Sequence, residues 1–170
     1  MTAHKSDIES AVSILLTPGG LDLNALDAGL GYAMGAGTDY ADLYFQRTWQ
    51  EGWVLEDGEV KEASYNIDGG VGVRSLAGEK TGFAYSNQIT ADALMDTGRT
   101  ASGIVRSGKQ LPGQKVMPVS VASYYAGIDP LAGLSAEYKV AMLKEADRVA
   151  RAADPSISQV SASLSGTYEV

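Results

Sequence analysis

Apolar residues recur at intervals of three and four in four segments of the chain, which predicts four amphipathic helices. Two of them precede Tyr40, over 6–16 and from Asp22 onward, and they make residues 1–39 a helical lead-in. A third helix follows Thr90 and a fourth follows Ser135, because both hydroxyls can accept a hydrogen bond from a free N–H group at a helix start.

The spacing within the last two helices also predicts which sides are buried. In the third helix we expect a buried face made of Ala93, Leu94, Thr97, Ala101, Ile104 and Val105. In the fourth we expect an apolar stripe made of Tyr138, Met142, Ala146, Val149 and Ala153. The charged residues of the fourth helix should then lie in solvent: Glu137, Lys144, Glu145, Asp147, Arg148 and Arg151.

Between residues 40 and 88 the apolar period shortens to two, which is typical of half-buried strands. The expected strands cover 41–49, 53–55 (separate, or a continuation past Gly52), 60–67, 71–76 and 80–85. Asp57-Gly58, Asp68-Gly69-Gly70 and Ala77-Gly78 are the expected turns between them. The sequence therefore predicts an α+β fold, with an antiparallel β meander packed against several α-helices.

Two glycines lie inside the expected strands, Gly72 and Gly82. Glycine weakens a strand unless the backbone needs a bulge or a close approach there. We therefore interpret both as structural glycines.

The segment 154–170 is an amphipathic strand whose two faces differ in chemistry. One face is apolar: Val160, Ala162, Leu164, Tyr168 and Val170. The other is small and hydroxylated, and we interpret Ser161, Ser163 and Ser165 as substrate-cleft candidates. The chain stops inside this strand, so we expect residues 1–170 to form a single N-terminal domain of a longer protein. An open strand edge would then favour self-association.

The expected helices of residues 89–153 are separated by a long loop over 107–129. Residues 119–125 have the pattern of a short strand within it.

Charge and composition narrow the possible partners. The formal net charge is −8 and no lysine or arginine cluster is present, so we expect no direct nucleic-acid binding. No apolar run approaches the roughly 20 residues that a membrane helix needs. We see no signal peptide and no cysteine, and both observations favour the cytoplasm.

Candidate chemistry is sparse. A zinc hydrolase needs three protein ligands, whereas this sequence has one histidine, His4, and no cysteine. We therefore expect no catalytic residue, no metal ligand and no cofactor in this chain. The acidic pairs Glu51/Glu56 and Asp57/Glu59 flank turns and are interpreted as solvated.

Two other features bear on binding. Gly78-Glu79-Lys80-Thr81-Gly82 lacks the spacing of a phosphate loop and opens a strand instead of a helix. Among the aromatic residues, Tyr44 alternates away from the expected core face, and we include Tyr44 and Trp53 among the substrate-cleft candidates.

Several ordered motifs resemble the TldD/PmbA metallopeptidase family, and its TldD branch more than its TldE/PmbA branch. They run from about Tyr40 to Val170 and read YADLYFQ (40–46), WVLEDG (53–58), GVGVR (70–74), GEKTGFAY (78–85), DPL (129–131) and ASLSGTYE (162–169).

The resemblance implies an α+β protein about three times this length, with a zinc-binding His-Glu-x-x-x-His motif in its C-terminal half. It also implies a heterodimer of TldD and TldE that degrades unstructured peptides, matures peptide antibiotics such as microcin B17 and acts on an antitoxin. That antitoxin opposes a gyrase poison, which explains the family label "modulator of DNA gyrase". No residue here matches the zinc motif, so the zinc is expected in the full-length protein only.

Three interpretations stay open. The first is a non-catalytic N-terminal domain of such a peptidase, which helps to form the substrate cleft and the interface with a TldE/PmbA-type subunit. The second is a stand-alone protein-binding module, for gyrase or toxin–antitoxin modulation, without enzymatic activity. The third, an independent hydrolase, lacks metal ligands and a nucleophile–base pair.

Overall fold

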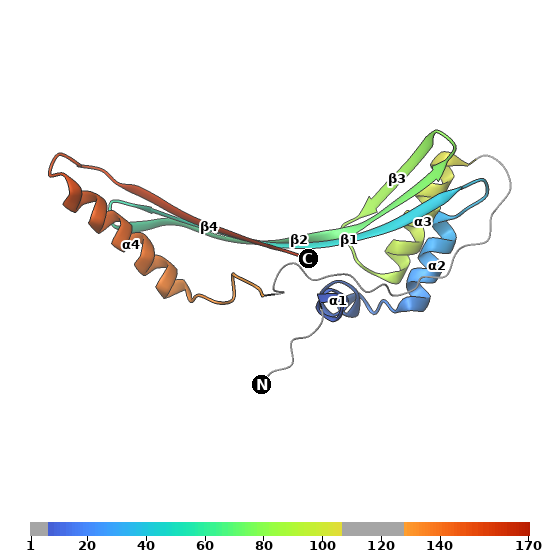
Figure 1. Cartoon of the computed structure of the whole chain (residues 1–170), viewed down its shortest axis with the longest axis horizontal. Coiled ribbons are helices and arrows are strands. Elements are labelled where there is room, and N and C mark those ends of the chain that lie inside the picture. Colours follow the sequence, from blue (N-terminus) through green and yellow to red (C-terminus); the bar gives the residue numbers. More distant parts are fainter. Residues whose placement is uncertain (1–6, 107–127) are drawn as a thin grey trace. The chain divides into compact units, whose positions relative to one another are not determined.

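The computed structural model describes residues 7–106 and 128–170 and has the predicted α+β class (Figure 1). His4 and the expected strand at 119–125 lie outside the described residues. The described strands form one sheet in the order β3-β2-β1-β4. The elements are α1 (Asp7–Ala11) with a π-helical turn (Val12–Leu16) and a 3₁₀ turn (Thr17–Gly19), α2 (Leu23–Ala33), β1 (Tyr40–Glu56), β2 (Glu59–Ala77), β3 (Lys80–Ser86), α3 (Ala91–Val105), α4 (Ala136–Ala153) and β4 (Ser161–Glu169).

The predicted helix starts are confirmed by side-chain caps. A carboxylate oxygen of Asp22 accepts a hydrogen bond from the Ala25 N–H at 2.8 Å. The hydroxyls of Thr90 and Ser135 accept from the N–H groups three residues further on, at 3.3 and 3.2 Å. Each cap satisfies one of the N–H groups that a helix start leaves without an intrahelical partner.

The strands are longer than predicted, because β1 and β2 run without interruption over 17 and 19 residues. The expected turn at Asp68-Gly69-Gly70 is wrong. Gly69 and Gly70 instead permit close backbone approach: a Cβ at Gly69 would lie 2.8 Å from the Gln46 carbonyl oxygen, and one at Gly70 would lie 2.3 Å from that of Ser86. The turn at Asp57-Gly58 is confirmed, with φ of 49° and 79°.

The chain divides into two compact units, and β1 and β2 contribute residues to both. Of the described residues, the first unit contains 7–47, 68–106 and 170. There α3 packs against both β3 and α2 (Figure 1). Val71 and Val73 of β2 are buried with Leu94 and Ala101 of α3, and the inner face of β1 packs against this cluster. Ile104 was expected in this core but is 57% exposed.

The second unit contains residues 48–67 and 128–169, with α4 packed against β4. The predicted apolar stripe of α4 is wrong, since Tyr138, Met142 and Val149 are 56%, 44% and 52% exposed. Ala146 and Ala153 are exposed as well. The inward face of α4 is instead the row Lys139, Leu143 and Asp147, one helical turn apart. Burying two charges is possible because each has an ionic partner.

Candidate functional site

The register of β1 and β4 separates two chemically different faces of the sheet in the second unit. Glu51 pairs with Gly166, and the Glu51 carboxylate meets Lys139 of α4, so this face is the one that α4 covers. Trp53, Leu55, Leu164 and Tyr168 alternate onto the same face. The four hydroxylated residues of β4 are exposed and belong to the opposite face, which no described helix of this unit covers and which we call the helix-free face: Ser161, Ser163, Ser165 and Thr167.

A shallow groove of about 300 Å³ lies on the helix-free face. Its lining includes Ser165 and Thr167 of β4, Gln50 and Gly52 of β1, and Ser64 and Asn66 of β2, with Glu51 and Gly166 completing it. A Cβ at Gly52 would lie 3.0 Å from the Ser64 Oγ, so glycine at this position leaves room between the strands. The Glu51 carboxylate lies against Lys139 on the opposite face, so the side chains that face the groove are uncharged and can donate and accept hydrogen bonds.

The structure does not bring all the cleft candidates together. Ser161, Ser163 and Ser165 share one face, whereas Trp53 lies on the face that α4 covers. The Trp53 Nε1 is buried and has no hydrogen-bond partner among the described residues. Tyr44 belongs to the first compact unit and is 58% exposed.

Sequence reasoning missed a buried ion pair that positions α4. The Lys139 Nζ lies 2.7 Å from the Glu51 Oε1 and also donates to the Leu131 carbonyl oxygen at 3.0 Å. Both side chains are nearly inaccessible, at 6% and 11% exposed, so the interpretation of Glu51 as a solvated turn residue is wrong. Gly166 makes the space, because a Cβ there would lie 2.5 Å from Leu131. The spacing of Lys139, Leu143 and Asp147, four residues apart on one side of the helix, was the sequence signal that could have indicated this buried pair.

A second polar cluster ties the β1–β2 turn to both ends of the α4–β4 connection. Arg151 Nη2 lies 2.6 Å from Asp57 Oδ1, and its Nε donates to Asp147. The Val160 N–H donates to the same Asp57 oxygen at 3.1 Å. This N–H, and then the Arg151 guanidinium, hold the pKa of Asp57 below its ordinary value of 3.8.

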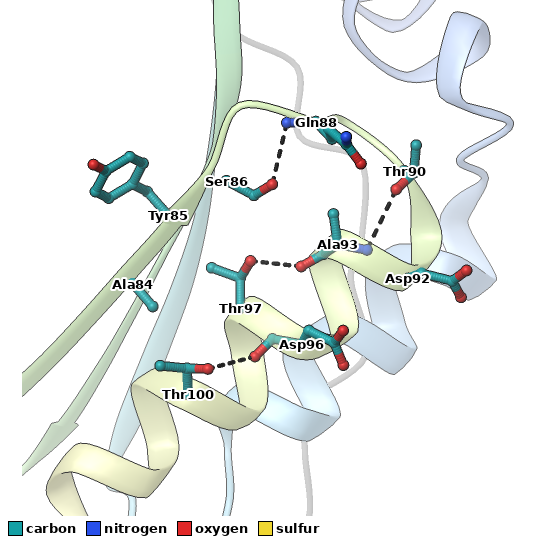
Figure 2. Close-up of a pocket in the computed structure, with 10 residues that line it drawn as sticks. All are labelled: Ala84, Tyr85, Ser86, Gln88, Thr90, Asp92, Ala93, Asp96, Thr97 and Thr100. Atoms are coloured by element: carbon teal, nitrogen blue, oxygen red, sulfur yellow. Dashed lines mark hydrogen bonds between the residues drawn. The ribbon is translucent and has the colours of Figure 1, made fainter.

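The first unit contains a separate hollow of about 660 Å³ between β3 and α3 (Figure 2). Figure 2 shows Ser86 at the end of β3, Gln88 in the loop that follows, Thr90 at the N-cap of α3, and Thr97 and Thr100 along α3. Thr97 and Thr100 donate to carbonyl oxygens of their own helix, those of Ala93 and Asp96. The two glycines interpreted as structural, Gly72 and Gly82, are both buried within the strands beside this helix.

Metal-binding groups do not assemble in the part of the chain that the structure describes. Over residues 7–106 and 128–170, no three His, Cys, Asp or Glu side chains are placed to hold a metal ion. The described residues therefore do not fit a zinc site. The helices among them also include none that is long and apolar enough to cross a membrane.

Two family models match the chain in order. Residues 41–105 match PmbA/TldA metallopeptidase domain 1, and residues 129–170 match the PmbA/TldA metallopeptidase central domain. A metalloprotease TldD homolog from Haemophilus influenzae is 45% identical over 157 residues, which is 91% of this chain and 33% of the relative. The chain thus spans about a third of the length of the curated relatives it matches.

Solved structures share the fold at low sequence identity. A proposed modulator of DNA gyrase from Bacteroides thetaiotaomicron is 17% identical with a TM-score of 0.58, over 86% of this chain and 36% of that one. TldE from Thermococcus kodakarensis is 16% identical with a TM-score of 0.56, over 85% of this chain and 34% of that one. With both family models matched in sequence order, the chain belongs to the PmbA/TldD metallopeptidase family, as the motifs between Tyr40 and Val170 predicted.

Proposed function

We propose that this chain is the non-catalytic N-terminal part of a TldD-type zinc metallopeptidase that degrades or matures unstructured peptides in the cytoplasm. It would act with a TldE/PmbA-type partner subunit, which it contacts. The zinc ion and the catalytic groups would come from the remaining two thirds of the length that the curated relatives have. The matches to PmbA/TldA metallopeptidase domain 1 and to the central domain support this role.

The observation that carries the proposal is the serine-lined, helix-free face of β4. An unfolded peptide exposes N–H and C=O groups at every residue, and most of them need hydrogen-bond partners when they leave water. Ser165, Thr167, Gln50, Ser64 and Asn66 offer such partners without charge and with little bulk. A wall of this kind suits a cleft that admits peptides of many sequences.

The test uses the full-length protein with its partner subunit and unfolded casein as substrate. The double variant Ser163→Tyr/Ser165→Tyr fills the helix-free face, and Ser156→Tyr is the matched control on an exposed turn outside the sheet. We expect the double variant to raise KM several-fold with little change in kcat, because it removes binding that substrate and transition state share. An unchanged KM with the same fold would contradict the cleft role.

A second measurement concerns the 170-residue chain alone. We expect no cleavage of casein with or without added zinc. Metal-dependent turnover that persists through repurification would mean that the active site lies within this chain.

A further inference from the structure

The hollow between β3 and α3 lies beside an open strand edge. Among the described residues β3 is the last strand of the sheet order and pairs with β2 alone. Ala84, Tyr85 and Ser86 of β3 form one side of the hollow, and Ala93, Asp96, Thr97 and Thr100 of α3 form the other. The hollow is therefore a groove between an edge strand and a helix (Figure 2).

The hairpin register determines which backbone groups of β3 face this edge. Gly78 and Glu79 form a two-residue loop with φ of 57° at Gly78, so Ala77 and Lys80 are the hydrogen-bonded pair that closes the turn. Hydrogen-bonded and non-hydrogen-bonded pairs alternate along an antiparallel ladder. The N–H and C=O groups of Phe83 and Tyr85 consequently point away from β2. Figure 2 shows the Tyr85 ring pointing away from α3, which leaves its backbone beside the groove.

The charge of the groove selects among possible occupants. Its ten lining residues include Asp92 and Asp96 but no lysine, arginine or histidine. Asp96 has an ion pair with Arg99 at 2.8 Å, but both side chains are more than half exposed, so this pair is weak and can exchange partners. The hydroxyls of Thr97 and Thr100 already donate within α3, which leaves the two carboxylates as the strongest acceptors.

We propose that this groove binds an extended peptide as an added strand on β3, with a lysine or arginine side chain directed to Asp92 and Asp96. An added strand would lie about 4.8 Å from β3, and every second side chain would face α3. Backbone pairing gives affinity for many sequences, and the carboxylates favour a basic residue at one position. This site lies in the first compact unit, whereas the serine-lined groove lies in the second. Peptide binding at this site does not depend on catalysis or on the proposed function.

The experiment titrates the 170-residue chain with two fluorescein-labelled nonapeptides, one alternating threonine and lysine, the other alternating threonine and glutamine. Tyr85→Pro removes the outward N–H without removing a ladder bond, and proline is tolerated on an edge strand in that position. Tyr85→Ala is its matched control, because it removes the ring and keeps the N–H. Asp92→Asn/Asp96→Asn removes the charge, and Asp68→Asn is the control for an exposed carboxylate elsewhere.

We expect Tyr85→Pro to weaken the binding of both peptides, whereas Tyr85→Ala should still bind both. Asp92→Asn/Asp96→Asn should weaken the affinity for the lysine peptide by about three- to tenfold, since each exposed ion pair contributes little. The affinity for the glutamine peptide should stay unchanged. Amide NMR shifts on binding should concentrate at Phe83–Ser86 and along α3. The proposal is overturned if neither peptide binds, if shifts lie outside these residues, or if folded Tyr85→Pro binds as Tyr85→Ala does.

Discussion

Gly82 of β3 lies directly against the backbone of α3 at Ala101, where a Cβ on Gly82 would sit 2.1 Å from the Ala101 carbonyl oxygen. Backbone atoms of a packed helix move little, so Gly82→Ala should cost at least the about 1–3 kcal/mol of ordinary overpacking. Gly72→Ala should cost less, because among the described residues its Cβ would meet only the Phe83 ring, at 3.2 Å. Thermal unfolding measures both. Gly103→Ala is the control, since no described residue lies within 4 Å of a Cβ at this position. Equal melting midpoints for Gly82→Ala and Gly103→Ala would show that α3 shifts to accommodate the added methyl group.

Removing one partner of the buried Lys139–Glu51 pair should destabilise the fold more than removing both. Lys139→Met leaves a carboxylate that is 11% exposed without its cation, and loss of one partner of a buried pair costs about 3–5 kcal/mol. Lys139→Met/Glu51→Leu should recover much of this loss, because no buried charge remains unpaired. Urea unfolding followed by tryptophan fluorescence reports on this unit, which contains both tryptophans, Trp49 and Trp53. Additive losses in the double variant would refute the coupling.

The Asp57 cluster should make stability depend on pH in acid. The Val160 N–H and the Arg151 guanidinium lower the pKa of Asp57 in the folded chain below 3.8. Folding therefore favours the ionised carboxylate: its contribution is complete above the unfolded pKa and is lost as pH falls through the lower, folded pKa. Asp57→Asn should melt below the wild type at neutral pH, and the difference should shrink in acid. Asparagine also tolerates the positive φ of this position. A difference that is constant through the acid range would contradict the charge argument.

Two adjacent residues of α4 distinguish its inner and outer faces. Leu143 is 5% exposed and Met142 is 44% exposed. We expect Leu143→Ala to cost about 2–5 kcal/mol and Met142→Ala to stay within about 0.5 kcal/mol. Chemical denaturation of the 170-residue chain compares them directly. The opposite ranking would show that Met142 lies on the inner face of α4, as the apolar periodicity predicted.

Local signals predicted the element types well. Asp22, Thr90 and Ser135 start helices because their side chains cap the N–H groups that follow them, an interaction contained within four residues. Asp57 and Gly58 turn the chain because both tolerate positive φ. The alternation of β4 likewise predicted that Ser161 and Ser163 would be exposed.

Long-range packing could not be predicted in the same way. Asp68-Gly69-Gly70 has turn composition, but neighbouring backbones at Gln46 and Ser86 require glycine within a continuous strand. Apolar periodicity favoured Tyr138 and Met142 for the inner face of α4, whereas ionic partners at Glu51 and Arg151 permit Lys139 and Asp147 to be buried there. The groove between β3 and α3 forms only where these two elements pack together, and the local sequence of neither element predicts that packing.

The uninterrupted strands β1 and β2 mean that sequence domains and spatial units do not coincide. Residues 48–67 fall within the match to domain 1, yet they belong to the compact unit of α4 and β4, which match the central domain. Cutting the gene between residues 105 and 129 would separate α4 and β4 from half of their own sheet. A chimera that exchanges the central domain between relatives should therefore carry the β1–β2 hairpin tip with it, because that tip lies within the sequence of domain 1 but packs with the central domain.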